Sequence, residues 1–191
     1  MKLKKPHHTI KLSRGCKEDL LIWRTFLSNF NGKCFFLDER YMSNERLQLF
    51  TDASGKGFGA VFKNLWFFGE WNKQWASQNI TVQELYPIVL AVETWGMCMQ
   101  NKSICFHTDN EALVHILNKM TSKDKNIMYL IRRLVLVALN YNILFSSQHI
   151  QGKLNIASDA LSRLQIDKFL QLVPEAEQIP ASIPLLPKLP V

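Results

Sequence analysis

Residues 47–71 read LQLFTDASGKGFGAVFKNLWFFGEW, and this stretch decides the fold of the chain. Its apolar runs at 47–51, 58–63 and 65–71 are separated by turn-forming residues at 52–57 and at 63–64. Short apolar runs bounded by glycine, asparagine and aspartate are typical of neighbouring β-strands. We therefore predict three strands that form an antiparallel meander.

The residues after this meander alternate between helical and strand-like patterns. We predict strands over 103–108 and 142–150, and helices over 81–99, 110–119, 124–141 and 156–172. A meander followed by alternating elements favours an α/β fold. The expected architecture is a five-stranded mixed sheet, with its first three strands antiparallel and with helices on both faces.

The two ends of the chain differ in composition from this central part. Residues 1–17 carry six Lys and Arg and no acidic residue, and residues 15–31 show the periodicity of a helix. The segment 173–191 contains five of the seven prolines and is interpreted as an extended linker. The predicted organisation is thus a basic arm with a helix at 1–45, a domain at 46–172 and a linker at 173–191.

Composition excludes some classes of protein. The chain has 191 residues and a formal net charge of +7, which suits a polyanionic partner, although a basic end also serves as a solubilising arm. It contains no run of about 20 apolar residues and no secretory signal, so we expect a soluble intracellular protein of the cytoplasm or nucleus, without a membrane partner. Four cysteines without paired spacing indicate neither a zinc site nor a disulfide framework.

Four acidic residues stand at the ends of predicted strands or near the starts of predicted helices, and each has an ordinary explanation. Asp52 suits a turn, Glu84 matches a capping box with Thr81, Asp109 could cap a helix, and Asp159 could complement a helix dipole. If the strands that end at Asp52 and Asp109 are parallel neighbours, however, both carboxylates emerge at one edge of the sheet.

Four carboxylates at one edge would repel one another unless cations neutralised them. Oxygen ligands alone suit Mg²⁺, or Mn²⁺ in its place, and two such ions about 4 Å apart catalyse phosphodiester hydrolysis in many nucleases. We therefore expect a site for two divalent ions and no small-molecule cofactor.

At these positions the sequence resembles the ribonuclease H family, especially the forms in gypsy-like and tyrosine-recombinase retrotransposons. The resemblance covers residues 47–172. Its motifs are TDASG at 51–55 with Gly57, Gly59 and Ala60, then Glu84-Leu85, TDN at 108–110, GKLN at 152–155 and SDALSR at 158–163.

The resemblance implies a role for each acid. Asp52 would bridge both metals, Glu84 and Asp109 would complete the site beside the leaving group, and Asp159 would hold the metal that activates water. His149 matches a histidine of the family that assists proton transfer or product release, although a strand-end histidine that only packs is the alternative.

The resemblance also suggests substrate contacts and partners. Ser54, Gly55 and Asn110 would meet the RNA backbone, although turn formation and helix capping explain them as well. Ser158 stands where gypsy-like elements usually have alanine. Only residues 121–125 separate two helices between which some cellular members carry a basic protrusion, so the domain should depend on a reverse transcriptase of the same polyprotein to grip an RNA/DNA hybrid.

The predicted function is therefore a ribonuclease H that cuts the RNA strand of RNA/DNA hybrids by two-metal hydrolysis, leaving a 3′-hydroxyl and a 5′-phosphate. One alternative is a catalytically silent or domesticated module that binds nucleic acid or scaffolds a polymerase. Another is an integrase or transposase nuclease, which needs a late glutamate on a helix after the second aspartate. Glu111 lies too close to Asp109 for that role, and residues 124–141 contain no interior glutamate.

Overall fold

The computed structural model describes residues 9–29, 44–150 and 155–189 of a chain that divides into two compact units, 1–33 and 34–191. In the first unit, α1 spans Arg14–Asn29 and confirms the predicted helix as far as the described residues reach. Trp23 and Phe26 form an edge-to-face pair on it, with ring centroids 6.1 Å apart. Among the described residues, no helix has the length and apolarity needed to cross a bilayer.

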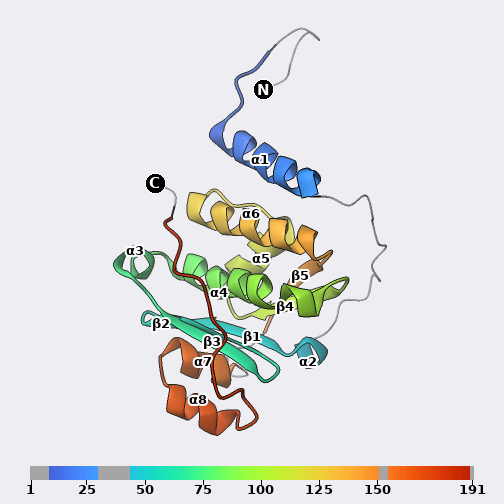
Figure 1. Ribbon diagram of the computed structural model, residues 1–191. Helices are drawn as coiled ribbons and strands as arrows, with labels where there is room; N and C mark the ends of the chain where they lie inside the picture. The colour runs from blue at the N-terminus through green and yellow to red at the C-terminus, as the bar shows by residue number, and fades with distance from the viewer. Residues whose placement is uncertain (1–8, 30–43, 151–154, 190–191) are drawn as a thin grey trace. The chain divides into compact units, whose positions relative to one another are not determined.

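The second unit contains the five predicted strands and, between them, helices in the predicted order, together with short helices at 44–47 and 73–76 that were not predicted (Figure 1). Its strands are β1 (Leu49–Ala53), β2 (Gly57–Phe62), β3 (Leu65–Glu70), β4 (Ser103–Thr108) and β5 (Leu144–His149). Its helices are α2 (Asn44–Leu47), α3 (Lys73–Ala76), α4 (Ile80–Trp95), the 3₁₀ helix η1 (Gly96–Met99), α5 (Glu111–Lys119), α6 (Lys125–Asn140), α7 (Ile156–Ser162) and α8 (Ile166–Leu172).

Backbone hydrogen bonds join the strands in two groups. The strands β1, β2 and β3 form the predicted antiparallel meander, in which Asp52 pairs with Gly59. The strands β4 and β5 are parallel, and Thr108 pairs with His149 at their carboxyl ends. β1 and β4 are in contact, so the ends of both groups lie together.

Helices cover both faces of the meander, as predicted. Phe58, Ala60 and Phe62 of β2 belong to the main core with α4, whereas Val61 belongs to a second cluster with α7 and α8. Because successive side chains of a strand point to opposite faces, this alternation places β2 between two helical layers, and every residue of β2 is buried. In Figure 1, α4 lies on one side of the three strands and α7 and α8 on the other.

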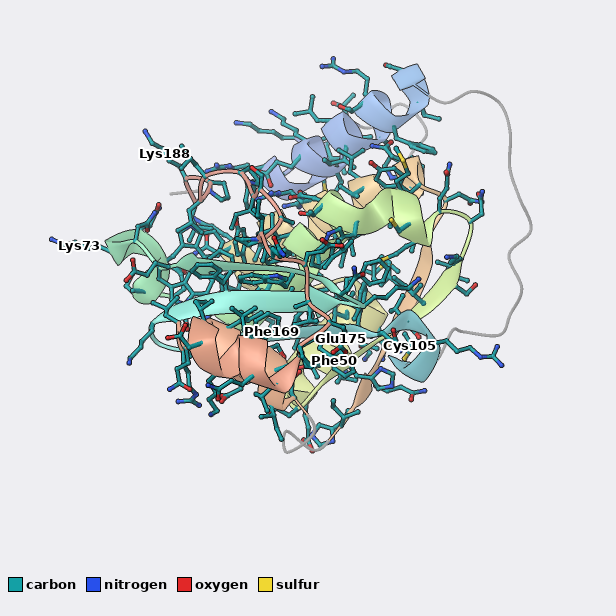
Figure 2. All side chains as sticks on the ribbon, turned by 60° about the horizontal axis from the view of Figure 1, so that its bottom comes forward. Phe50, Lys73, Cys105, Phe169, Glu175 and Lys188 are labelled. Atoms are coloured by element: carbon teal, nitrogen blue, oxygen red, sulfur yellow. The ribbon has the colours of Figure 1, made fainter. Side chains whose placement is uncertain are left out.

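The closing helix is not continuous, which corrects the prediction of a single helix over 156–172. It breaks after Ser162, and Leu164 takes a left-handed conformation with φ of 62°. The break turns α8 back against the sheet, where Phe169 packs on Trp66 with ring centroids 4.9 Å apart. Figure 2 labels Phe169 at α8. The hydrophobic periodicity continues across the break, because residues on both sides of it face the same sheet.

The proline-rich segment has neither helix nor strand over its described residues, 173–189, but it is attached to the domain. The Trp66 indole donates to the carbonyl oxygen of Glu177 at 2.8 Å, and the Trp75 indole donates to that of Pro187 at 2.9 Å. Leu189 is buried in the main core. In Figure 1 the segment crosses β3 as the dark red trace. Sequence analysis did not predict this packing, because neither proline nor periodicity signals it.

Candidate active site

Asp52 lies within β1, and the surrounding residues hold its side chain between the sheet and α7. It pairs with Gly59 in the meander, so the turn-forming explanation does not apply. The Ser162 hydroxyl of α7 donates to Oδ2 of Asp52 at 2.5 Å. A Cβ added to Gly59 would lie 2.3 Å from the Cβ of Leu161, so the absence of a side chain at position 59 lets α7 approach the strand.

Glu84 lies in the second turn of α4 and does not cap the helix. The helix begins at Ile80, and the side chain of Asn79 accepts a hydrogen bond from the backbone N–H of Val82 at 3.0 Å. Thr81 is therefore inside the helix, and the capping-box explanation for Glu84 is wrong. The Oε2 atom of Glu84 is buried without a hydrogen-bond partner, which is unusual for a structural carboxylate.

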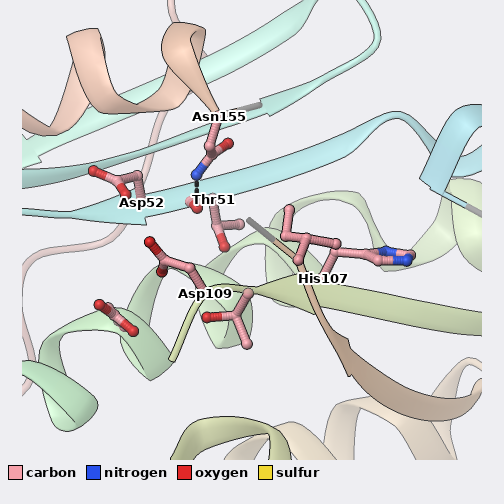
Figure 3. Close-up of a pocket in the computed structure, with 8 residues that line it drawn as sticks. Thr51, Asp52, His107, Asp109 and Asn155 are labelled. Atoms are coloured by element: carbon pink, nitrogen blue, oxygen red, sulfur yellow. Dashed lines mark hydrogen bonds between the residues drawn. The ribbon is translucent and has the colours of Figure 1, made fainter. Parts of the chain in front are cut away.

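Asp109 follows β4 directly and does not cap the next helix either. Asn110 is the N-cap of α5, and its Oδ1 accepts from the backbone N–H of Leu113 at 3.1 Å. The capping explanation for Asp109 is therefore wrong. A pocket is lined by Asp52, Glu84 and Asp109 together with Thr51, His107, Thr108, Ile150 and Asn155 (Figure 3). Three of the four predicted acids thus meet in one pocket.

The electrostatics of the pocket follow from burial and from like charges. Burial, which is the largest cause, and the charges of Asp109 and Asp52 together raise the pKa of Glu84 to about 7, although the polar side chain of Asn110 lowers it. Burial likewise raises the pKa of Asp52 to about 6, with the Ser162 hydrogen bond opposing and the charges of Asp159 and Asp109 adding. The ionised carboxylates therefore destabilise one another, and a cation between them would relieve that repulsion.

Comparison with known proteins identifies the family of the chain. The family described as the RNase H-like domain found in reverse transcriptase matches residues 42–141, which is more than half of the chain. The chain belongs to this family. The match includes Asp52, Glu84 and Asp109, whereas His149 and Asp159 lie beyond it.

Two further comparisons accompany the family match. RNase H1 from the halophilic archaeon Halobacterium salinarum NRC-1 is similar in structure, with a TM-score of 0.48, 14% sequence identity, and coverage of 63% of this chain and 95% of that chain. A search of curated proteins finds no match.

In this ribonuclease H-like domain, Asp159 lies beside the pocket and not in its lining. It occupies the first turn of α7, and its Oδ1 accepts from Nε of Arg163 at 2.7 Å. Its charge contributes to the raised pKa of Asp52, so the two carboxylates are near one another. The pKa of the exposed Arg163 is raised by its hydrogen bond and charge interaction with Asp159. The fourth acid is thus close to Asp52 and is paired with Arg163.

His149 ends β5 at the rim of the same site. Its exposed ring places Nε2 3.2 Å from the backbone oxygen of Asp109, which the parallel pairing of Thr108 with His149 brings close. The other histidine at the site, His107, lines the pocket and has a pKa lowered by burial, so it is neutral near pH 7. In Figure 3 the His107 ring points away from Asp52 and Asp109. His149 is therefore the histidine of the site whose ring is exposed to solvent.

The three residues predicted to contact RNA differ in whether their side chains are already hydrogen-bonded within the protein. A Cβ added to Gly55 would meet nothing within 4 Å, so this position is open. The Ser54 hydroxyl donates to the backbone oxygen of Ser162 at 2.7 Å and accepts from the N–H of Lys56 at 3.1 Å. Asn110 is occupied at both ends of its amide, because Oδ1 caps α5 and Nδ2 donates to the Thr81 hydroxyl at 3.3 Å. Their contact with RNA remains a prediction.

Sequence reasoning missed the residues that hold the acids. Asn155 donates through Nδ2 to the backbone oxygen of Thr51 at 2.8 Å, beside Asp52 (Figure 3). Ser162 binds Asp52 directly, and Arg163 binds Asp159. All three belong to the GKLN and SDALSR motifs, so a signal was present. Their partners could not be predicted, because the contacts with β1 join residues more than 100 positions apart.

The carboxylate oxygens at the site are donors that suit a divalent metal ion, but the side chains are not positioned to coordinate one. In the part of the chain that the structure describes, no group of three or more His, Cys, Asp and Glu side chains is arranged so that it could hold a metal ion. Two of the four carboxylates have partners within the protein, since Ser162 binds Asp52 and Arg163 binds Asp159. The buried Oε2 of Glu84 and a donor set made only of oxygens nevertheless match what Mg²⁺ requires.

Proposed function

We propose that this domain is a metal-dependent endoribonuclease that cuts the RNA strand of an RNA/DNA hybrid, leaving a 3′-hydroxyl and a 5′-phosphate, during the reverse transcription of a retroelement. Membership of the reverse-transcriptase ribonuclease H family supports the class of substrate. The gypsy-like or tyrosine-recombinase type of the element remains a prediction from the sequence motifs.

One observation carries this proposal. Carboxylates from β1, from α4 and from the end of β4 converge on a single pocket, and two of them have pKa values raised to about 6 and about 7. A fold that brings like charges together at a cost in stability is typical of a site that binds a cation. Turn formation does not explain Asp52, and helix capping explains neither Glu84 nor Asp109. A functional explanation remains for all three.

The roles of the four acids follow the family resemblance. Asp52, Glu84, Asp109 and Asp159 would hold two Mg²⁺ ions, with Mn²⁺ as a substitute. Such ions, when bound, lower the pKa of water and stabilise the charge on the leaving oxygen of a phosphodiester. To bind a metal ion, Asp159 must break its ion pair with Arg163. Because that pair is exposed to solvent, the exchange costs little.

His149 would act on protons at the edge of the site. Its ring is exposed and lies against the backbone of Asp109, so it can take a proton from the site and release it to water. This role needs no contact with the metal-binding carboxylates. It predicts that replacing His149 slows turnover and leaves the affinity for metal unchanged.

Most of the affinity for the hybrid would come from a reverse transcriptase of the same polyprotein. Hybrids are recognised by shape and by 2′-hydroxyl groups, with little reading of bases. The connection between α5 and α6 spans only residues 120–124, which leaves no room for an added basic helix there. The basic arm at 1–17 could add phosphate contacts, but residues 1–8 lie outside the described part of the chain.

A catalytically silent module that binds nucleic acid is the second candidate. The ion pair between Asp159 and Arg163 favours it, because a carboxylate neutralised by a neighbouring arginine has less need of a metal. The intact set of four acids opposes it. Cleavage distinguishes the two candidates, since a silent module would bind hybrid and release no fragments.

The test is cleavage of an RNA/DNA hybrid labelled on its RNA strand by the full chain, with Mg²⁺ or with a chelator. We expect shortened RNA only with the metal, with 3′ ends that a polymerase can extend. Asp52→Asn and Asp109→Asn should each abolish cleavage and leave the circular dichroism spectrum unchanged. Asp167→Asn, the same change at an exposed residue of α8, should cleave like the wild type.

Two results would count against the proposal. Cleavage retained by either Asp52→Asn or Asp109→Asn would refute the assigned site. Binding of hybrid by the wild type, measured by fluorescence anisotropy, with no fragments in Mg²⁺ or Mn²⁺ would favour the silent module.

A further inference from the structure

Helix α7 buries two serines on the face that packs against the meander. Ser158 and Ser162 are each 0% exposed and stand four residues apart, so they lie on the same side of the helix. A buried hydroxyl costs free energy unless it is hydrogen-bonded, and alanine would fill nearly the same space without that cost. The presence of a hydroxyl at position 162 therefore calls for a specific reason.

The contacts of Ser162 supply that reason. Its hydroxyl lies 2.5 Å from Oδ2 of Asp52 and 3.0 Å from the backbone oxygen of Asp159, one turn earlier in the helix. A hydroxyl has one proton to donate. The shorter contact and the charged acceptor both favour Asp52, because hydrogen bonds to ionised groups are the stronger ones.

The backbone around Ser162 is held in place by further bonds to the same strand. Its carbonyl oxygen accepts from the Ser54 hydroxyl at 2.7 Å, just beyond the end of β1. Before the helix starts, Asn155 donates to the carbonyl oxygen of Thr51 at 2.8 Å. Hydrogen bonds from both ends of α7 thus reach residues on either side of Asp52, and the Ser162 hydroxyl has little freedom to move.

We propose that Ser162 is a positioning residue for Asp52 and thereby sets the affinity of the site for its divalent metal. This inference rests on the proposed function. By anchoring Oδ2, the hydroxyl restrains the rotamer of the Asp52 carboxylate, which lines the pocket with Glu84 and Asp109. Groups that orient a metal ligand in this way commonly change metal affinity about 10- to 100-fold when they are removed.

The test compares Ser162→Ala with a matched control, Ser147→Ala. Ser147 is a buried serine of β5 whose hydroxyl donates to the backbone oxygen of Val114 at 2.9 Å, and it touches no acid of the site. Both changes remove one buried hydroxyl and one hydrogen bond. The stability loss should therefore be similar, while only Ser162→Ala should affect the metal.

The measurement is the rise in Tm of the full chain as MgCl₂ or MnCl₂ is added without nucleic acid. We expect Ser162→Ala to raise the half-saturating metal concentration about tenfold, and Ser147→Ala to leave it within about twofold of the wild type. Ser162→Cys, which keeps the branching of the side chain and is slightly larger but is a weak donor, should behave like Ser162→Ala. It also provides the test if the alanine variant does not fold.

Hybrid cleavage at increasing Mg²⁺ adds a second measurement. Ser162→Ala should need more Mg²⁺ for half-maximal rate and keep the wild-type KM for hybrid, because Ser162 does not touch the substrate. Equal metal dependence of Ser162→Ala, Ser162→Cys and wild type would overturn the inference and leave the proposed function intact. A wild type without any cation-dependent change in Tm or cleavage would overturn both.

Discussion

Replacing Glu84 by glutamine should make the metal-free domain more stable at alkaline pH. Glutamine has nearly the same shape as glutamate, and its amide oxygen can still accept hydrogen bonds. The change removes the charge that burial and the neighbouring acids Asp109 and Asp52 disfavour. A substitution at the centre of a proposed active site is thus expected to stabilise the fold while it removes function.

The magnitude follows from the pKa of Glu84, which rises from 4.5 in the unfolded chain to about 7 in the folded protein. Each tenfold change in proton affinity is worth about 1.4 kcal/mol, so complete transfer of this difference would be about 3 kcal/mol. Because the side chain is only partly buried and solvent screens its charge, we expect about 1–2 kcal/mol.

The dependence on pH has a definite sign. An acid whose pKa is higher in the folded state binds protons more tightly there, so folding stability falls as pH rises between about 4.5 and about 7. Below that window both states are protonated and the penalty is absent, whereas above it the penalty is complete. The advantage of Glu84→Gln should therefore be full at pH 8 and nearly gone at pH 4.5.

The assay is urea denaturation in the presence of a chelator at pH 8 and at pH 4.5. Glu175→Gln is the control, because it makes the same change at an exposed side chain of the C-terminal segment and should match the wild type (Figure 2). Added Mg²⁺ at pH 8 should stabilise the wild type more than Glu84→Gln. Equal stability of Glu84→Gln and wild type at pH 8 would refute the view that Glu84 is an energetically unfavourable charge at this site.

The remaining predictions concern the packing around the site. Deleting residues 173–191 removes two indole hydrogen bonds and a buried leucine, and should lower the free energy of unfolding by about 2 kcal/mol, or Tm by roughly 4–8 °C; an unchanged Tm in a thermal melt would show that the segment adds no stability. Gly59→Ala would place a methyl group against Leu161, and should cost about 2 kcal/mol or more in urea denaturation; wild-type stability would mean that α7 can move away without loss.

The meander could be predicted from sequence because its determinants are local. Apolar runs of strand length alternate with Gly, Asn and Asp at 52–57 and 63–64, and turn chemistry at such residues acts over a few positions. The four acids were predicted from motifs in a fixed order, each at an element end. The resemblance implied their grouping, and the structure brings three of them to one pocket and the fourth beside it.

Local sequence patterns also led to wrong predictions at two places in the domain. Thr81 and Glu84 have the spacing of a capping box, yet Asn79 begins the helix two residues earlier. Periodicity also continued through Leu164, although the chain turns there with a left-handed residue. In both places several local patterns were acceptable, and packing against the sheet selected one of them.

The sequence by itself determined the order of strands and helices, the identity of the acids and the family to which the chain belongs, since these depend on spacing and residue type. Only the tertiary structure decided that the Ser162 hydroxyl binds Asp52 and that Oε2 of Glu84 is buried without a hydrogen-bond partner. It also decided that the proline-rich segment packs on β3 and α3. The physical reason is that pKa shifts and the packing of the C-terminal segment arise from contacts between residues distant in the chain, and their energies depend on distances that no linear spacing specifies.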